Sequence, residues 1–129
     1  MGRLDADDGE LAARFRSLDE AARRRLACSM VRLALNECEP PVSLPPTAEQ
    51  LLGKGGVATP AQLAELDRRA ASSGAARKDD AVMRRARAVA AVRYALSPQP
   101  RAAEEALYEA MHATRSFPVA LEEARRRIH

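Results

Sequence analysis

The sequence predicts an all-α protein, a single-domain bundle of six or seven short helices around a central helix at about residues 18–38. Alanine, the best helix former, accounts for 28 of the 129 residues and lets neighbouring helices approach closely. Helix start and stop signals recur along the chain, whereas the two-residue alternation of strands is missing. We expect a single helical domain over residues 1–129, irregular at about 1–8 and 39–46.

The first two predicted helices cover about residues 9–16 and 18–38. Ser17 and Glu20 have the spacing of a capping box, in which both side chains pair with free backbone N–H groups. Pro40-Pro41 ends the second helix because proline has no N–H to donate. Apolar side chains cover well over half of its circumference, which makes it the central helix. The remaining polar strip consists of Arg25, Ser29, Arg32 and Asn36.

Two shorter helices are expected in the middle of the chain. Thr47–Gln50 has the spacing of a capping box, and the glycines within 53–56 would end that helix. Thr59–Gln62 repeats the capping pattern, with proline at the first helical position. The second helix then runs to about Ser73, with Gly74 as its C-terminal cap.

Three more helices complete the predicted bundle. The first begins at Asp79-Asp80, whose carboxylates suit the positive end of a helix dipole, and ends at Ser97-Pro98. The next runs from Pro100 to about Thr114, and the last follows Ser116-Phe117-Pro118. Apolar residues recur at helical spacing in all three, so each should bury one face.

The charge and hydropathy of the chain limit the classes of partner. The formal net charge is +3, and acidic residues are mixed among the basic ones, unlike the dense basic stripe of many nucleic-acid-binding proteins. No stretch is apolar for long enough to form a membrane helix, and the acidic N-terminus is unlike a signal peptide. We expect a cytoplasmic protein with no membrane partner, for which nucleic acid is an unfavoured ligand.

Motifs for catalysis, metal binding and nucleotide binding are incomplete. Gly53–Gly56 lacks the spacer and the Ser/Thr of a phosphate loop. Glu109 and His112 have Glu-x-x-His spacing, but carboxylate-bridged metal sites need two such motifs and two more glutamates. Cys28 and Cys38 would lie about 15 Å apart on one helix, too far for a disulfide. We expect free thiols, no cofactor, no metal and no enzymatic activity.

One predicted helix face has the composition of a protein interface. Its residues are Arg101, Glu105, Tyr108, His112 and Arg115, which cluster opposite the apolar side of their helix. A tyrosine framed by arginine and histidine is typical of a binding hot spot. Either this face is exposed and binds a partner protein, or another helix of the bundle covers it.

A second pattern suggests nucleic-acid binding. The candidate contact residues are Arg77, Arg84, Arg85 and Arg87. They follow a segment, Thr59–Gly74, that loosely resembles the first helix of a helix-turn-helix, whose second helix would enter the major groove. However, the connection to the next helix is long for such a turn, and Asp79-Asp80 would bring negative charge to the DNA. Nucleic-acid binding is therefore the alternative hypothesis.

Several segments together resemble the alanine-rich helical immunity proteins of bacterial toxin systems, over about residues 20–115. They are Arg24–Leu33, Gly56–Leu63 and the alanine-rich stretches 86–95 and 102–113. This resemblance implies an all-helical protein that binds and neutralises a cognate toxin without catalysis. The leading hypothesis is a non-catalytic protein-interaction module that neutralises a partner such as a toxin. Nucleic-acid binding through the arginine-rich helix and an oligomeric scaffold bundle are the alternatives.

Overall fold

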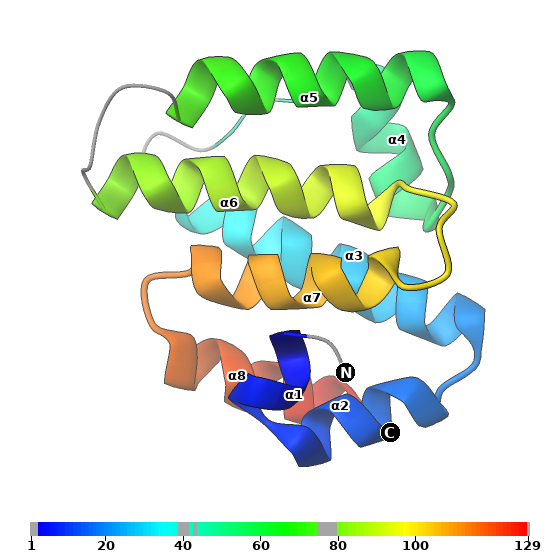
Figure 1. Ribbon diagram of the computed structural model, residues 1–129, viewed down its shortest axis with the longest axis vertical. Helices are drawn as coiled ribbons and strands as arrows, with labels where there is room; N and C mark the ends of the chain where they lie inside the picture. Colours follow the sequence, from blue (N-terminus) through cyan, green and yellow to red (C-terminus); the bar gives the residue numbers. More distant parts are fainter. Residues whose placement is uncertain (1–2, 39–41, 43, 75–79, 129) are drawn as a thin grey trace.

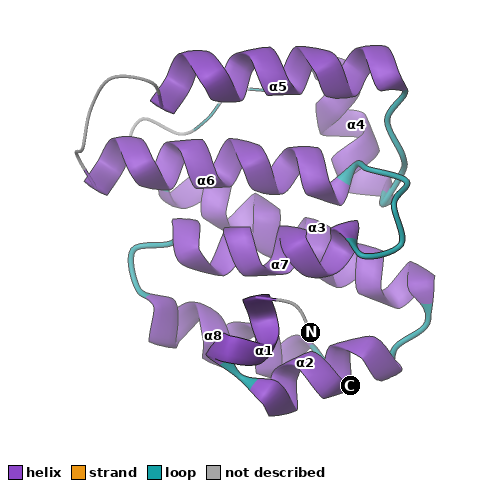
Figure 2. Cartoon of the chain, viewed as in Figure 1, coloured by secondary structure: helices purple, strands orange, loops and turns teal. Residues whose placement is uncertain are grey.

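The computed structural model describes residues 3–38, 42, 44–74 and 80–128, with the side chains of 69–82 excepted. Within these ranges it contains eight helices and no strand (Figure 2), which confirms the all-α prediction. The helices are α1 (Arg3–Asp7), α2 (Gly9–Ser17), α3 (Glu20–Glu37), α4 (Pro46–Lys54), α5 (Pro60–Gly74), α6 (Asp80–Ala95), α7 (Ala102–Ala113) and α8 (Phe117–Arg127).

The longer helices form two layers. Figure 1 shows α5, α6 and α7 side by side, with α3 behind α6 and α7. These contacts are direct, because α6 packs against α5 and α7, and α3 packs against both α6 and α7. Helix α4 lies against α3 near the α5 end of the bundle, while α1, α2 and α8 lie at the α7 end (Figure 1).

Two helices are central. As predicted for the segment at about 18–38, α3 contacts several others, namely α4, α6, α7 and α8. Helix α7 is enclosed more fully, since nine of its twelve residues are buried, compared with eight of eighteen in α3. One side of α3 therefore remains open, and it forms the candidate site described below.

The core between α3, α6 and α7 is rich in alanine. The alanines with no exposed surface on these helices are Ala27, Ala34, Ala88, Ala91, Ala95, Ala106 and Ala110. Met30, Leu96 and Leu107, which are equally buried, fill the spaces between them. Because the separation of packed helices depends on the side chains at the contact, short methyl groups allow the backbones to approach closely.

The capping boxes predicted before α3 and α5 have different outcomes. The box at α5 is confirmed, because the backbone N–H of Thr59 donates to the side chain of Gln62 at 2.8 Å and the reverse bond is 3.2 Å. The box at Ser17 and Glu20 is wrong. Ser17 is the last residue of α2, and Asp19 caps α3 by accepting a backbone hydrogen bond at 2.7 Å. Both residue types are good caps, and α2 extends far enough to include the serine.

Helix α4 also begins differently from the prediction. The expected capping box at Thr47–Gln50 is wrong, because the helix starts at Pro46 and has no side-chain cap. A proline at the first position needs no N–H partner and already has a helical φ. At the other end, Gly55 adopts the left-handed conformation with φ of 67° and caps the helix, which confirms the predicted glycine stop.

The N-terminal segment is more ordered than the sequence predicts. The sequence predicts an irregular segment at about residues 1–8, but residues 3–7 form α1. Leu4 of this helix has no exposed surface. An isolated helix of this length is unstable in water, so its stability comes from packing rather than from propensity. In the other segment expected to be irregular, residues 42, 44 and 45 lie outside the helices, and Pro40-Pro41 lies outside the described residues.

Candidate functional site: an arginine-lined trough on α3

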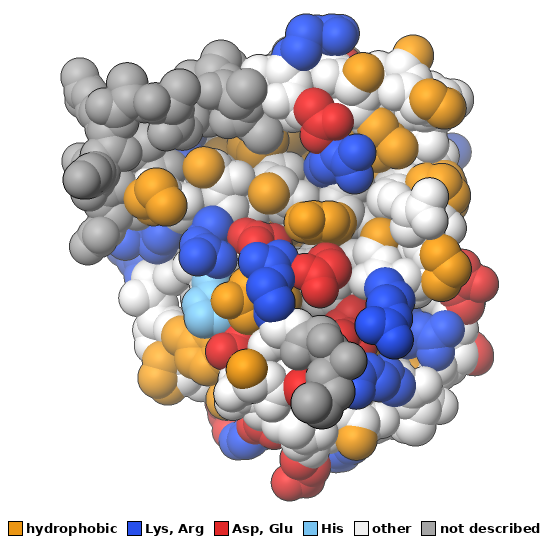
Figure 3. Space-filling model, in the orientation of Figure 1, with side chains coloured by type: hydrophobic (Ala, Val, Ile, Leu, Met, Phe, Trp, Pro, Cys, Tyr) orange, Lys and Arg blue, Asp and Glu red, His pale blue; other side chains and the backbone are white. Residues whose placement is uncertain are grey.

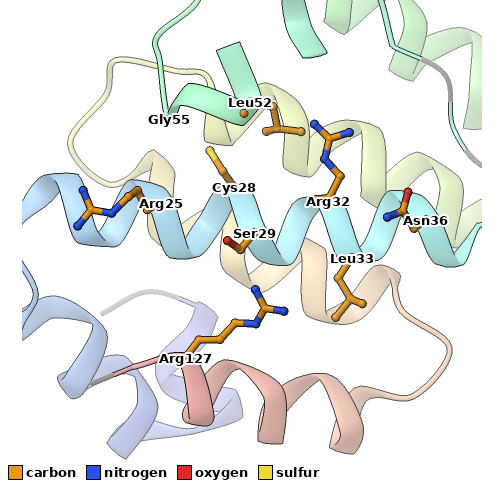
Figure 4. Close-up of a pocket in the computed structure, with 10 residues that line it drawn as sticks. Arg25, Cys28, Ser29, Arg32, Leu33, Asn36, Leu52, Gly55 and Arg127 are labelled. Carbon is orange, nitrogen blue, oxygen red and sulfur yellow. The ribbon is translucent and has the colours of Figure 1, made fainter. Parts of the chain in front are cut away.

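The open side of α3 forms the floor of a groove of about 440 Å³. The residues that line it are Arg25, Cys28, Ser29, Arg32, Leu33, Asn36, Leu52, Gly53, Gly55 and Arg127. Figure 4 shows the floor residues along α3, with Leu52 and Gly55 on one side and Arg127 on the other. The groove thus lies between the C-terminal ends of α4 and α8.

The floor of the groove is the polar strip predicted from the sequence. Arg25, Ser29, Arg32 and Asn36 are spaced by three or four residues, which places them on one face of the helix. The opposite faces of α3 bury its apolar side chains in the core. The same amphipathic pattern that docks α3 therefore turns these polar groups outward.

The walls come from distant parts of the chain. Gly55 ends α4 beside α3, and a Cβ placed on it would lie 3.9 Å from the Cγ atom of Arg25. Arg127, in the last turn of α8, points toward Ser29 across the groove (Figure 4). Arg25, Arg32 and Arg127 therefore line the groove from two helices, with the Arg25 guanidinium directed toward the start of α3 and that of Arg32 toward α4 (Figure 4).

The charged residues that line the groove are all arginines. No aspartate or glutamate occurs among the described residues that line it. Arg25 makes no ion pair or hydrogen bond with any residue that the structure describes. Arg32 pairs with Glu49 of α4, with Nη1 and Oε2 2.6 Å apart, and Arg127 pairs with Glu123 of its own helix at 2.8 Å. Both acidic partners stand outside the lining.

An adjoining hollow of about 410 Å³ extends the groove toward the start of α3. It is lined by Leu18, Ala22, Arg25, Leu26, Ser29 and Arg127, three of which also line the first groove. We call the two together the α3 trough. From Ala22 to Asn36 the helix rises about 21 Å, which sets the length of the trough. Such a site is elongated and open rather than an enclosed cavity.

The cysteine in the trough is not an activated nucleophile. The Cys28 side chain is largely buried, and burial raises the pKa of its thiol, outweighing the lowering by Arg24 and Arg32. The neutral thiol is therefore the form present near pH 7, whereas nucleophilic cysteines act as thiolates. Cys28 and Cys38 are both free and buried, which confirms the prediction of unpaired thiols.

Helix α1 covers the centre of the interface predicted on α7. The guanidinium of Arg3 lies 4.1 Å from the centroid of the Tyr108 ring and pairs with Glu105 at 2.6 Å. His112 Nε2 lies 2.7 Å from a carboxylate oxygen of Asp7. Glu105, Tyr108 and His112 are thus half-buried, and the second of the two predicted alternatives, coverage by another helix, applies to them.

The ends of the predicted interface remain accessible. Arg101 and Arg115 are exposed, but they flank a covered centre rather than a continuous open face. On the side of the molecule shown in Figure 3, basic and acidic side chains are interspersed over α1 and α7. This surface carries charges of both signs, whereas every charged residue that lines the α3 trough is an arginine.

The arginines proposed for nucleic-acid contact do not form a free row. Arg84, Arg85 and Arg87 are half-buried on α6, which packs against α3, α5 and α7. Arg87 points to Glu109 of α7, with Nη1 and Oε2 3.4 Å apart. Arg77 lies outside the described residues. Because α6 is surrounded by three helices, it is poorly placed to enter a major groove as a recognition helix.

In the described part of the chain, every helix is too short or too polar to span a bilayer. Among the same residues, no group of three or more histidine, cysteine, aspartate or glutamate side chains is arranged to hold a metal ion.

Comparison with known proteins identifies no relative: no family model, no curated protein and no solved structure matches the chain. The resemblance to immunity proteins therefore stays a prediction that depends on the quoted sequence segments.

Proposed function

We propose that this protein is a non-catalytic protein-interaction module and that its partner protein docks in the α3 trough. The observation that carries the proposal is the set of three arginines around the trough, with no carboxylate among the described lining residues. Arginine is enriched in protein interfaces, and a few such residues carry most of the binding energy.

The size and lining of the trough favour a polypeptide as the ligand. The first groove combines the guanidinium groups with the side chains of Leu33 and Leu52. A protein segment can supply both the charged and the apolar groups that match this surface, over a length of about 21 Å. A small molecule would be held in a more enclosed and more apolar site.

Binding without catalysis agrees with the chemistry of the trough. Its described lining contains no histidine or carboxylate to act as a general acid or base. The one thiol, at Cys28, is buried and has a raised pKa. Neutralisation of a partner by occupying its surface needs none of these groups. A toxin is the partner that the sequence resemblance to immunity proteins suggests.

The proposal is tested by affinity capture from cells of the native host, followed by mass spectrometry. Arg25→Glu reverses a charge in the trough without breaking an ion pair with any described residue. Arg68→Glu is the control, because it makes the same change in charge on the exposed side of α5, where it breaks only an exposed ion pair with Glu65. We expect a protein partner that the wild type and Arg68→Glu retain and that Arg25→Glu loses.

Three outcomes would overturn the proposal. A partner that Arg25→Glu retains equally would place the interface elsewhere. Nucleic acid as the principal captured species, with affinity that falls steeply as salt rises, would favour the nucleic-acid alternative. Capture of further copies of the chain alone would favour the oligomeric scaffold.

A further inference from the structure

We propose that the α3 trough binds an acidic segment of its partner and that this segment displaces Glu49 from Arg32. The inference rests on the proposed function and specifies the chemistry of the bound segment. It assigns to Glu49 the role of an internal competitor, which occupies one cation of the trough until the partner arrives.

The spacing of the cations matches that of two carboxylates in one segment. Arg25 and Arg32 are seven residues apart on α3, so their Cα atoms are separated by about 10.5 Å along the helix axis. A single carboxylate cannot pair with both. Side chains of an extended chain alternate between two faces, so two carboxylates four residues apart point to the same side and are separated by about 13 Å. An acidic segment with such a spacing can therefore pair with both arginines at once.

The three cations differ in how they are paired in the free protein. Arg25 has no described partner, so it is available to an incoming carboxylate. Arg127 shares Glu123 with Arg126, which also pairs with that carboxylate. Glu123 therefore remains paired with Arg126 when Arg127 turns toward a ligand. Only Arg32 is held by an acidic residue of its own, Glu49.

The ion pair between Arg32 and Glu49 is easily exchanged. Both side chains are 39% exposed, and such surface ion pairs contribute little to stability. A carboxylate from the partner would replace Glu49 with similar geometry, and Glu49 would turn into solvent. The free energy needed to break the pair is small, but this cost lowers the affinity of the trough for every acidic ligand.

An apolar residue, Leu33, lies next to Arg32 in the groove. It is half-buried, whereas Leu52 on the other side of the groove is only 3% exposed. An apolar side chain next to an acidic residue in the partner would cover Leu33 while the carboxylate reaches Arg32. The segment that fits best is therefore acidic with apolar residues between its carboxylates.

The experiment measures binding of a fluorescein-labelled peptide of ten glutamates by fluorescence polarisation at low salt. We expect the wild type to bind it, and Arg25→Glu to bind it about tenfold more weakly. Removal of the competitor in Glu49→Gln should tighten binding by about threefold or more. The matched control is Glu10→Gln, which makes the same change in net charge at a residue of α2 whose side chain is 79% exposed.

The competitor role and the trough are tested separately by these variants. If Glu49→Gln binds the peptide no more tightly than Glu10→Gln, Glu49 does not compete for Arg32 and that part of the inference is wrong. If Arg25→Glu binds as tightly as the wild type, the peptide does not occupy the trough. A labelled oligonucleotide of ten thymidines is the comparison ligand. Tighter binding of that ligand than of the glutamate peptide at equal salt would overturn the inference in favour of phosphate.

Failure of the inference and failure of the proposed function are distinguishable. If the wild type captures a protein that Arg25→Glu loses, yet the glutamate peptide does not bind, the protein-interaction function stands and the acidic-segment inference falls. If neither capture of the protein nor binding of the peptide depends on Arg25, the proposed function and the inference are both wrong.

Discussion

Arg24 of α3 donates a hydrogen bond of 3.0 Å to the backbone carbonyl of Ser97, just beyond the end of α6. The same guanidinium nitrogen donates to the carbonyl of Ala95 at 3.2 Å, and the Arg24 residue is only 9% exposed. The negative end of the α6 dipole therefore faces a buried cation. This contact joins two of the core helices through a charged group rather than through apolar packing alone.

The contact predicts that Arg24→Met lowers the free energy of unfolding by about 2–3 kcal/mol, because it leaves buried carbonyls without donors. Urea denaturation measures the effect. The adjacent Arg25→Met is the matched control, and we expect it to change stability by less than about 0.5 kcal/mol at its exposed position. Equal losses in the two variants would contradict a structural role for the Arg24 bonds.

A second prediction concerns how α1 is held in place. Leu4 is fully buried, whereas the ion pairs of Arg3 involve a side chain that is 45% exposed. We expect Leu4→Ala to cost about 2–4 kcal/mol and Arg3→Ala less than about 1 kcal/mol. Hydrogen exchange of the α1 amides, with urea denaturation, measures both. A larger loss in Arg3→Ala would show that the ion pairs, not the core, hold α1.

The pH dependence of stability should reflect Asp8, the N-cap of α2. A backbone hydrogen bond from Leu11 and the ion pair with Arg125 lower the pKa of Asp8. A lowered pKa means that the stabilisation is present above the unfolded value of about 3.9 and is lost as pH falls through the folded value. Asp8→Ala should cost about 1 kcal/mol at pH 7.

The measurement for Asp8 is urea denaturation of the wild type and Asp8→Ala at several pH values between 7 and about 2.5. The difference in unfolding free energy should be constant near neutral pH and should shrink below about pH 4. A difference that stays constant to the lowest pH would show that the carboxylate charge does not contribute through this cap.

The fold class could be predicted from the sequence because it depends on local patterns. Proline, glycine and capping residues mark most helix ends within a few positions, and the pair Thr59 and Gln62 even forms the expected reciprocal bonds. Helix α1 could not be predicted, since five residues carry too short a pattern and its stability depends on the burial of Leu4.

The candidate site could be predicted only in part. The polar strip with Arg25 and Arg32 was visible at helical spacing, but a strip of this kind is usually an ordinary solvated face. The strip becomes the floor of the trough only after the helices have packed, because Gly55 and Arg127, which form the walls, are distant in sequence. Conversely, Tyr108 was visible as a candidate hot spot, and tertiary packing of Arg3 covers it.

The last prediction separates the α3 trough from the α7 face as the site of partner binding. Tyr108 stacks with Arg3 and lies 4.4 Å, between ring centroids, from His112. Tyr108→Ala should therefore lower the free energy of unfolding by about 1–2 kcal/mol through loss of these contacts. Partner capture by the folded variant should equal that of the wild type, because the trough is unchanged. A folded Tyr108→Ala protein that loses a partner which Arg25→Glu retains would move the interface to α7, and α1 would then be a cover that the partner displaces.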